Sequence, residues 1–538
     1  MTAALTLARE AFARQAWTQA LEAFASADRL QRVDHERFAI AAYLTGADEE
    51  CERAWDAAHR AALHDGDCAE AARCAFWLGL CLMLRGQMAQ AGGWLSRTES
   101  LVAEADADCA ASGYLLIPAV LGALHDGDPE GARDLSLRAI DIGKRFGDAD
   151  LRAFGVLGLG QALIALGDTA RGTTRLDEAM VSVTAGEVGP ITSGIVYCAV
   201  ILECMALFDL PRAAEWTGAL SEWCDAQPDL VPFRGQCLVH RSQIHMVGGQ
   251  WADAIAVANA ACRRLTDPPH PALGLAYYQE GELHRLIGAI EEAEEAYRNA
   301  SRHGHDPVPG LALLHVARGD MEAAAATIRR TMHESRTPAL LAAAVDILRV
   351  AGDVAAARAA ADELTALSRA TPSAVLGAMA AQARGGVLVA EGDPVAALTE
   401  LRAAAKTWQA LRMPYEGART AVLLGLACAA LGDRGAATME FDNARSTFAQ
   451  LGARPDLDRL DALTGPATVS RDDTGLSQRE RDVLTELASG KTNRQIASVL
   501  HISPHTVGRH VENLFTKLGV TSRAAATARA YELGLISR

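Results

Sequence analysis

A short turn signal recurs along most of the chain and sets the strongest limit on its fold. Gly-Asp, or a close equivalent, is followed five residues after its first position by a small residue, and the signals lie 31 to 41 residues apart. They begin at Gly86, Gly127, Gly167, Phe208, Gly249, Gly288, Gly319, Gly352, Gly392 and Gly432. Such a period is typical of stacked helical hairpins, each of which packs on its neighbours. We therefore expect a long α-solenoid.

Each unit of this array can be explained by simple backbone chemistry. The glycine is expected to end the first helix in the left-handed conformation, the aspartate to cap the second helix, and the small residue to let the two helices approach closely. A second small residue follows twelve positions after the first position of the signal, at Ala139, Ala179, Ala300, Ala404 and Ala444. The pattern resembles the tetratricopeptide repeat, although most units exceed its 34 residues. Weaker units are expected around Trp17 and Gly46, and no alternating segment predicts a sheet.

The segment 476–538 has a different, non-repeating pattern of helix starts and stops. Its start signals are two capping boxes at Ser477–Glu480 and Thr492–Gln495, then Ser503 followed by Pro504, then Thr521–Arg523. Gly490 and Gly519 suit helix ends, and a fourth helix is expected to end near Gly534. Two short helices joined by a turn of about three residues predict a helix-turn-helix, whose second helix enters the major groove of DNA.

The expected recognition helix, from Pro504 to Leu518, has two distinct faces. Its buried stripe is Val507, Val511, Leu514 and Leu518, and its opposite face is His505, Arg509, Glu512 and Thr516. Both sets follow the three-to-four-residue step of an α-helix. The polar face is the one expected to turn toward base edges.

These four helices resemble the LuxR-type (GerE-like) helix-turn-helix of bacterial transcription regulators. The resemblance rests on the residues Leu476–Glu480, Asn493, Ile496–Ala497, Ile502–Ser503, Thr506–Val507, His510–Val511 and Lys517–Gly519. It implies that Thr506 and Lys517 contact phosphates, that Arg509 and Glu512 face the groove, and that the fourth helix pairs two copies. The full set of expected DNA-binding residues is Asn493, Arg494, Ser503, His505, Thr506, Arg509, Glu512, Asn513, Thr516, Lys517 and Arg523.

Two positions of the recognition helix depart from the basic character of that family. Gly508 stands where the family commonly has Lys, and Glu512 stands where Lys is frequent. A glycine inside a helix costs about 1 kcal/mol relative to Ala and supplies no side-chain contact. Glu512 either accepts a hydrogen bond from a cytosine amino group or repels phosphate. These residues either weaken DNA recognition or redirect it.

Charge separates the two parts of the chain. The whole protein has a formal net charge of −16, whereas residues 474–538 contain nine Lys and Arg against five Asp and Glu, a net +4. The rest, with 42 basic and 62 acidic residues, carries −20. Only the C-terminal part has the sign expected for binding DNA. We predict a repeat domain at 1–463, a polar linker at 464–475 and a DNA-binding domain at 476–538.

The array followed by the LuxR-type module also resembles the C-terminal two-thirds of the large ATP-dependent LuxR regulators. The stretches most like that group are Trp408, Pro414–Arg419, Leu431–Asp433 and Leu451–Ala453. Those regulators carry an N-terminal nucleotide-binding domain, but no G-x-x-x-x-G-K-[ST] motif occurs here. Gly143-Lys144 is followed by Arg145, and Gly490-Lys491-Thr492 follows Thr485 where the first glycine is required. No cofactor, ATP-driven switching or enzyme activity is expected.

The remaining sequence signals favour a cytoplasmic protein whose cysteines and histidines have structural roles. The eleven cysteines are scattered, and many lie in apolar helical patterns that predict buried, reduced thiols: Cys74, Cys81, Cys198, Cys204 and Cys428. His303 and His305 are too few for a metal site without further ligands, so none is expected. No signal peptide or membrane span is indicated, which favours a cytoplasmic protein.

Two functional hypotheses follow from these patterns. In the first, a transcription regulator senses a ligand through its repeat domain and binds promoter DNA as a dimer. Its expected partners are double-stranded promoter DNA, a second copy of the chain, a small-molecule or protein effector and RNA polymerase, with no membrane. In the alternative, the array is a protein-interaction scaffold and the C-terminal module has a weakened capacity for DNA. A further hypothesis is that the acidic array docks the basic module until an effector releases it.

Overall fold

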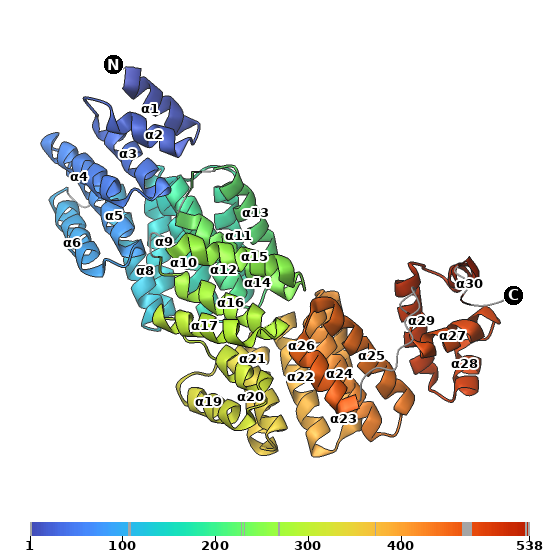
Figure 1. The fold of residues 1–538 in the computed structure, drawn as a ribbon. Helices are drawn as coiled ribbons and strands as arrows, with labels where there is room; N and C mark the ends of the chain where they lie inside the picture. Colours follow the sequence, from blue (N-terminus) through green and yellow to red (C-terminus); the bar gives the residue numbers. More distant parts are fainter. Residues whose placement is uncertain are drawn as a thin grey trace.

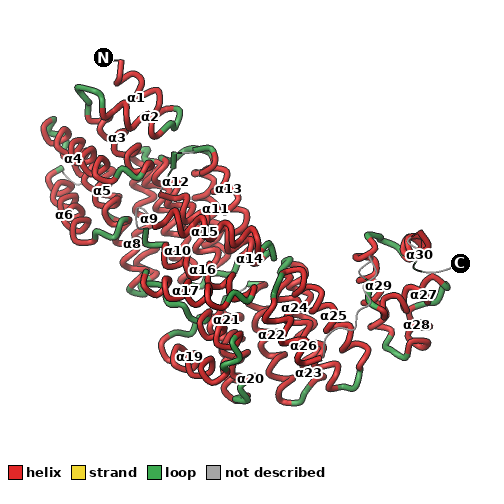
Figure 2. Tube along the Cα trace, viewed as in Figure 1, coloured by secondary structure: helices red, strands yellow, loops and turns green. Residues whose placement is uncertain are grey.

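The computed structural model is all-α and describes residues 3–105, 109–227, 229–230, 232–266, 270–371, 373–464, 476–532 and 535. Helices joined by short loops make up these ranges, which contain no strand (Figure 1, Figure 2). The first half contains α1 (Ala3–Ala13), α2 (Trp17–Ala25), α3 (Arg32–Thr45), α4 (Asp48–His64), α5 (Cys68–Leu84), α6 (Met88–Glu104), α7 (Ala110–Tyr114), α8 (Leu116–His125), α9 (Pro129–Phe146), α10 (Ala149–Ala165), α11 (Thr169–Thr184), α12 (Pro190–Ala206), α13 (Leu210–Asp225), α14 (Pro232–Val247) and α15 (Trp251–Thr266). The second half contains α16 (Leu273–Ile287), α17 (Ile290–Arg302), α18 (Gly310–Ala317), α19 (Met321–Glu334), α20 (Pro338–Val350), α21 (Val354–Ala370), α22 (Ala374–Glu391), α23 (Pro394–Ala410), α24 (Pro414–Ala430), α25 (Arg434–Leu451), α26 (Arg454–Thr464), α27 (Gln478–Ala488), α28 (Asn493–Leu500), α29 (Pro504–Leu518) and α30 (Arg523–Glu532).

The predicted turn chemistry is confirmed throughout the array. The first residue of all ten turn signals has a positive φ, including Phe208 at 56°, where a side chain occupies a conformation that favours glycine. The expected aspartates cap the following helices through their side chains: Asp128, Asp168, Asp209, Asp320, Asp353, Asp393 and Asp433. The local sequence therefore determines where each hairpin turns.

The small residues lie where pairs of helices approach each other. The residue five positions after the first residue of each turn signal is buried at all ten sites. The second set of alanines, led by Ala139 and Ala404, is buried as well. A side chain at Gly172 would come within 2.8 Å of the backbone oxygen of Gly160, so the larger residue types are excluded there. The prediction of an α-solenoid built from tetratricopeptide-like hairpins is confirmed, and the five cysteines named above are buried in it.

The solenoid also makes contacts between units that are far apart in the sequence. Ser373 donates a hydrogen bond of 3.1 Å to the carbonyl oxygen of Phe208, and the rings of Trp251 and Tyr415 lie 5.4 Å apart. Trp17 Nε1 donates to Gln227 Oε1 at 2.9 Å. In addition, α16 contacts α26. The array is thus a superhelix whose later turns close onto earlier ones, which no repeat signal predicted.

The C-terminal helices α27–α30 form a separate body beside the end of the array (Figure 1). They have a hydrophobic core of their own, whose buried residues all lie between Leu476 and Ala530. The array ends with α26 at Thr464, and the rest of the predicted linker, residues 465–475, lies outside the described residues. Across the described helices, none has the length and apolar character needed to cross a lipid bilayer.

Candidate nucleic-acid interface

The start of the C-terminal domain is organised by the predicted capping boxes. Ser477 Oγ accepts from the amide of Glu480, and Glu480 Oε2 accepts from the amide of Ser477 at 2.8 Å. Thr492 and Gln495 form the same reciprocal pair at the start of α28. Glu480 also accepts from Lys517 Nζ at 2.8 Å, so one carboxylate joins the first turn of α27 to the last turn of α29.

The turn between α28 and α29 follows the predicted pattern. His501 adopts a left-handed conformation with φ of 54°, which ends α28, and Ser503 caps α29 by accepting from the amide of Thr506 at 3.0 Å. Pro504 is the first residue of α29, where its missing amide has no cost. Two helices joined in this way form a helix-turn-helix, with α29 as the recognition helix.

The two faces of α29 lie largely as the sequence predicts. Val507, Val511, Leu514 and Leu518 are buried against α27, α28 and α30. His505, Glu512 and Thr516 are exposed on the other side, whereas Arg509 is only partly exposed. Gly508 adds no side chain to this surface, and a Cβ there would meet only Asn493 Nδ2, at 3.8 Å. Of the polar face that was expected to read DNA, Arg509 is therefore the member that is least accessible.

The other expected DNA-binding residues divide into exposed and internally bonded groups. Arg494 and Ser503 are exposed, and Asn513 is half-buried. Thr506 is buried, with its hydroxyl 2.7 Å from that of Ser503, and Lys517 is bonded to Glu480 as described. Arg523 donates to Asn493 Oδ1 at 2.7 Å and to the carbonyl oxygen of Lys491 at 2.6 Å. Asn493 and Arg523 thus connect α30 to the start of α28.

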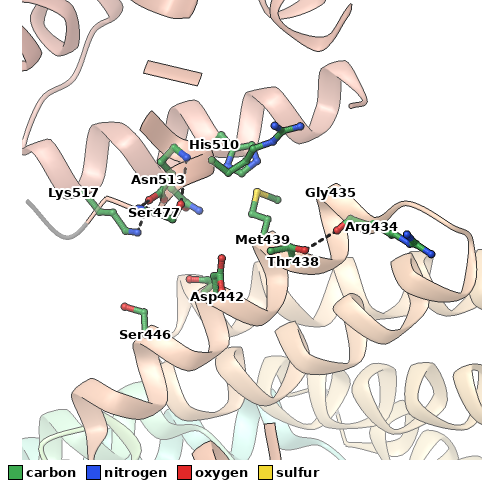
Figure 3. A pocket seen from close by; sticks show the side chains of 13 residues that line it. Arg434, Gly435, Thr438, Met439, Asp442, Ser446, Ser477, His510, Asn513 and Lys517 are labelled. Carbon is green, nitrogen blue, oxygen red and sulfur yellow. Dashed lines mark hydrogen bonds and ion pairs between the residues drawn. The ribbon is translucent and has the colours of Figure 1, made fainter. Parts of the chain in front are cut away.

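Helix α25 of the array faces one side of α29 across a cavity (Figure 3). Arg509 forms an ion pair and hydrogen bond with Glu440, whose side chain is only 4% exposed. In the first turn of α25, a Cβ on Gly435 would lie 2.7 Å from Ile502 Cγ2, so this glycine permits the close approach of the helix-turn-helix. A cavity of about 310 Å³ separates the rest of the two surfaces, with Met439 and Asp442 on one side and Asn513 on the other.

Polar atoms at this contact are incompletely satisfied. Within the described part of the chain, Glu440 Oε2 and both ring nitrogens of His510 have no hydrogen-bond partner. Burial raises the pKa of Glu440, and the positive charge of Arg509 opposes this rise. Burial lowers the pKa of His510 to about 4, and the neighbouring Glu480 opposes this shift. Unsatisfied buried groups cost free energy, so these atoms lower the stability of this contact.

The residues of this contact on the array were not predicted from the sequence. Glu440 does, however, carry a usable signal: it lies three residues after Ala437 and four before Ala444, both buried, and so occupies the apolar stripe of its helix. A carboxylate at such a position needs a partner. The sequence does not identify that partner, because Arg509 lies 69 residues away.

Comparison with known proteins identifies the C-terminal part. Residues 474–530 match the family of bacterial regulatory proteins of the luxR type. The nitrate/nitrite response regulator protein NarP of Escherichia coli is 62% identical over 52 residues, which cover 10% of this chain and 24% of NarP. The transcriptional regulatory protein YhcZ of Bacillus subtilis, uncharacterized, is 50% identical over 60 residues, covering 11% of this chain and 28% of YhcZ. This chain therefore spans about a quarter of the length of these curated relatives.

Solved structures resemble the whole chain only weakly. The APC/C hetero-tetramer Cut9-Hcn1 aligns with 86% of this chain and 96% of the solved chain, at 13% identity and a TM-score of 0.37. Yeast Tom70 aligns over the same shares at 11% identity and a TM-score of 0.29. The family assignment rests instead on the C-terminal sequence match and the helix-turn-helix seen there. Residues 474–530 are a domain of the luxR family of bacterial regulatory proteins.

Proposed function

We propose that this protein is a transcription regulator whose C-terminal domain binds double-stranded promoter DNA through α29. The observation that carries the proposal is a luxR-family domain whose recognition helix exposes His505, Glu512 and Thr516. The net +4 of residues 474–538 gives this domain the sign that attracts the phosphate backbone, in contrast to the acidic array. Binding as a homodimer, contact with RNA polymerase and a cytoplasmic location belong to the same proposal.

In this proposal the array controls access to the recognition helix. The major groove is about 12 Å wide and admits one helix, whereas two packed helices have axes about 8–10 Å apart and span roughly twice the width of one. While α25 faces α29 across this cavity, the pair is too wide for the groove and Arg509 is held by Glu440. DNA and α25 therefore compete for the same side of α29. An effector that favours separation of the two surfaces would increase the affinity for DNA.

The rival function is a protein-interaction scaffold with a weakened DNA-binding module. Two features of α29 favour it: Gly508 supplies no contact, and the exposed Glu512 places a carboxylate on the face expected to meet DNA. A carboxylate near phosphates is repelled unless it accepts from a cytosine amino group. The two functions differ in whether the module enriches a DNA sequence.

Selection of genomic DNA fragments tests the proposal. The intact chain and residues 470–538, which contain a hydrophobic core of their own, would be compared at the same near-physiological salt concentration. Enrichment of a shared, roughly palindromic motif is the expected result, with stronger binding by the isolated domain. Arg509→Ala should weaken this binding in the isolated domain, where α25 is absent. No enriched sequence with either protein would instead support the scaffold.

A further inference from the structure

A large cavity lies inside the superhelix, away from the C-terminal domain. It has a volume of about 620 Å³ and is lined by residues from α14, α16, α18, α20, α22, α24 and α26, with smaller parts of the helices between them. A second cavity of about 220 Å³ shares part of its lining, including Met379 and Gln382. The cavity is walled on several sides because Trp251 packs on Tyr415, which brings α15 and α24 together. Its volume falls in the range of sites for small organic molecules, about 300–1,000 Å³.

Most of the cavity wall is apolar. Trp251, Leu286, Leu313 and Ile347 contribute to it, together with methionines from several different helices. Met246, Met321, Met379 and Met413 are four of the eleven methionines of the chain. Methionine side chains are flexible and polarisable, and they adapt to ligands of irregular shape. A wall of this composition is well matched to the apolar part of a ligand and poorly matched to water.

The charged groups of the wall form ion pairs held by hydrogen bonds, with one exception. Arg285 donates to Glu282 at 2.7 Å, and Arg419 is held by Glu416, at 2.8 Å, and by Asp346. These contacts occupy the main acceptor oxygens of the cavity. Four arginines and four acidic residues line the cavity, so its wall has no net charge. Its preference for a charged ligand therefore depends on which of these side chains still lack a hydrogen-bond partner.

The exception is Arg349. Its side chain is only 17% exposed, and its carboxylate partner, Asp346, is 3.8 Å away and already bonded to Arg419. The Nε atom is buried and has no hydrogen-bond partner among the described residues. A Cβ on Gly386 would lie 3.4 Å from this Nε, so the glycine on α22 preserves the space around the guanidinium. The guanidinium of Arg349 is therefore the charged group of the wall with the weakest pairing.

We propose that this cavity binds a small amphipathic organic anion, with an apolar body against the methionines and a carboxylate on Arg349. A guanidinium bonds a carboxylate through parallel N–H donors in a geometry that other acceptors match less well. A buried donor without an acceptor is unfavourable, and a ligand oxygen would remove that penalty. The cavity is lined by several helices and has a volume of about 620 Å³, which suits a small molecule and is too small for a folded partner.

The position of the cavity also connects it with α25. Helices α24 and α26 line the cavity and flank α25 in the chain, and Phe448 of α25 is part of the wall. The same helix carries Glu440, which holds Arg509 of the recognition helix. A ligand that repositions α25 would change this contact. The role of the ligand as the effector of DNA binding rests on the proposed function, whereas the binding site itself does not.

The test uses the full chain and 8-anilinonaphthalene-1-sulfonate, an aromatic anion whose fluorescence rises in apolar sites. Saturable binding to the wild type is expected, with displacement by decanoate at least tenfold more effective than by decanol, because only decanoate offers a charged acceptor to Arg349. Arg349→Met should abolish this preference and keep decanol binding. Arg336→Met is the matched control, since Arg336 is exposed and paired with Glu363 outside the cavity.

Ala342→Phe gives a second, independent measure, because Ala342 lines both cavities and a larger side chain would fill the space. This variant should lose dye binding while its helical circular dichroism is retained. If either variant unfolds, Arg349→Lys, which keeps the charge but not the paired donors, should still reduce the decanoate preference. Equal competition by decanoate and decanol in the wild type, or unchanged dye binding by Ala342→Phe with its fold intact, would overturn the proposal.

The same experiment separates this proposal from the function of the whole protein, because dye binding is measured without DNA. If decanoate binds and leaves the DNA affinity of the full chain unchanged, the site stands and its effector role is overturned. If neither the full chain nor residues 470–538 binds DNA, the proposed function fails while the site stands. If decanoate does not compete at all but DNA binding is observed, the proposed function stands and the anion site is overturned.

Discussion

The repeat array and the C-terminal domain use their helix caps for different purposes. In the array, Asp128 and Asp393 are interchangeable parts of similar hairpins, and each unit packs mainly on its neighbours. In the C-terminal domain, Glu480 caps α27 and also holds Lys517 of α29, so a single residue joins two helices of a unique core. Repetition makes the local unit predictable, whereas the contacts that shape the whole molecule come from residues that do not repeat. Four experiments test this contrast.

The largest effect is expected from removing a residue that closes the superhelix. Trp251 is 3% exposed, donates to the carbonyl oxygen of Met246 at 3.0 Å and packs on Tyr415. Trp251→Ala should lower the free energy of unfolding of the surrounding region by about 3–5 kcal/mol, because a large cavity is left in a packed core. Chemical denaturation followed by fluorescence and circular dichroism measures this loss. Met88→Ala, at a 62% exposed site, is the control, and equal effects would show that closure contributes little.

The second effect concerns His510, where the two regions meet. Burial lowers the pKa of this imidazole to about 4, whereas an unfolded chain holds it near 6.5. The unfolded state therefore takes up the proton first, and stability present at neutral pH is lost as the pH falls from about 6.5 to 4, by up to about 3 kcal/mol. The imidazole resonances give the pKa directly by NMR. His510→Gln should remove this pH dependence while His501→Gln should keep it; titration of His510 near 6.5 would contradict the burial seen here.

The third effect isolates the contact between the array and the recognition helix. Glu440→Gln removes the charge that holds Arg509, so the DNA affinity of the full chain should rise by about tenfold or more, in line with the strength of charge-assisted hydrogen bonds. Fluorescence anisotropy with a selected DNA fragment measures it. Glu391→Gln is the matched control, because Glu391 pairs with Arg358 within the array. An unchanged affinity in the Glu440 variant would mean that this contact does not restrain DNA binding.

The smallest effect is expected from one of the repeated caps. Asp393 accepts a hydrogen bond of 3.0 Å from the amide of Ala396 at the start of α23. Asp393→Ala should lower stability by about 1 kcal/mol, the usual loss for a helix cap, and Asp393→Asn should retain most of it because the amide oxygen still accepts. Thermal and chemical denaturation give the comparison. A loss as large as that of Trp251→Ala would show that the caps are not local.

The accuracy of prediction follows the same division. Turn and cap positions were predictable because they depend on residues within one helical turn, such as Ser503 with Thr506 or Gly432 with Asp433. The exposed face of α29 was also predictable, apart from Arg509. The partner of Arg509 and the closure at Trp251 were not, because each joins residues that are distant in the sequence and belong to no repeated pattern.

The all-α fold, the position of the hairpin turns and the helix-turn-helix follow from local sequence, since left-handed glycines, side-chain caps and helical periodicity act over a few residues. The closure of the array around a cavity and the position of α25 beside α29 come from long-range packing instead. Small rotations between successive hairpins add along a solenoid, and their sum fixes which distant residues meet. That sum depends on the packing of every unit, so it cannot be predicted from any single motif.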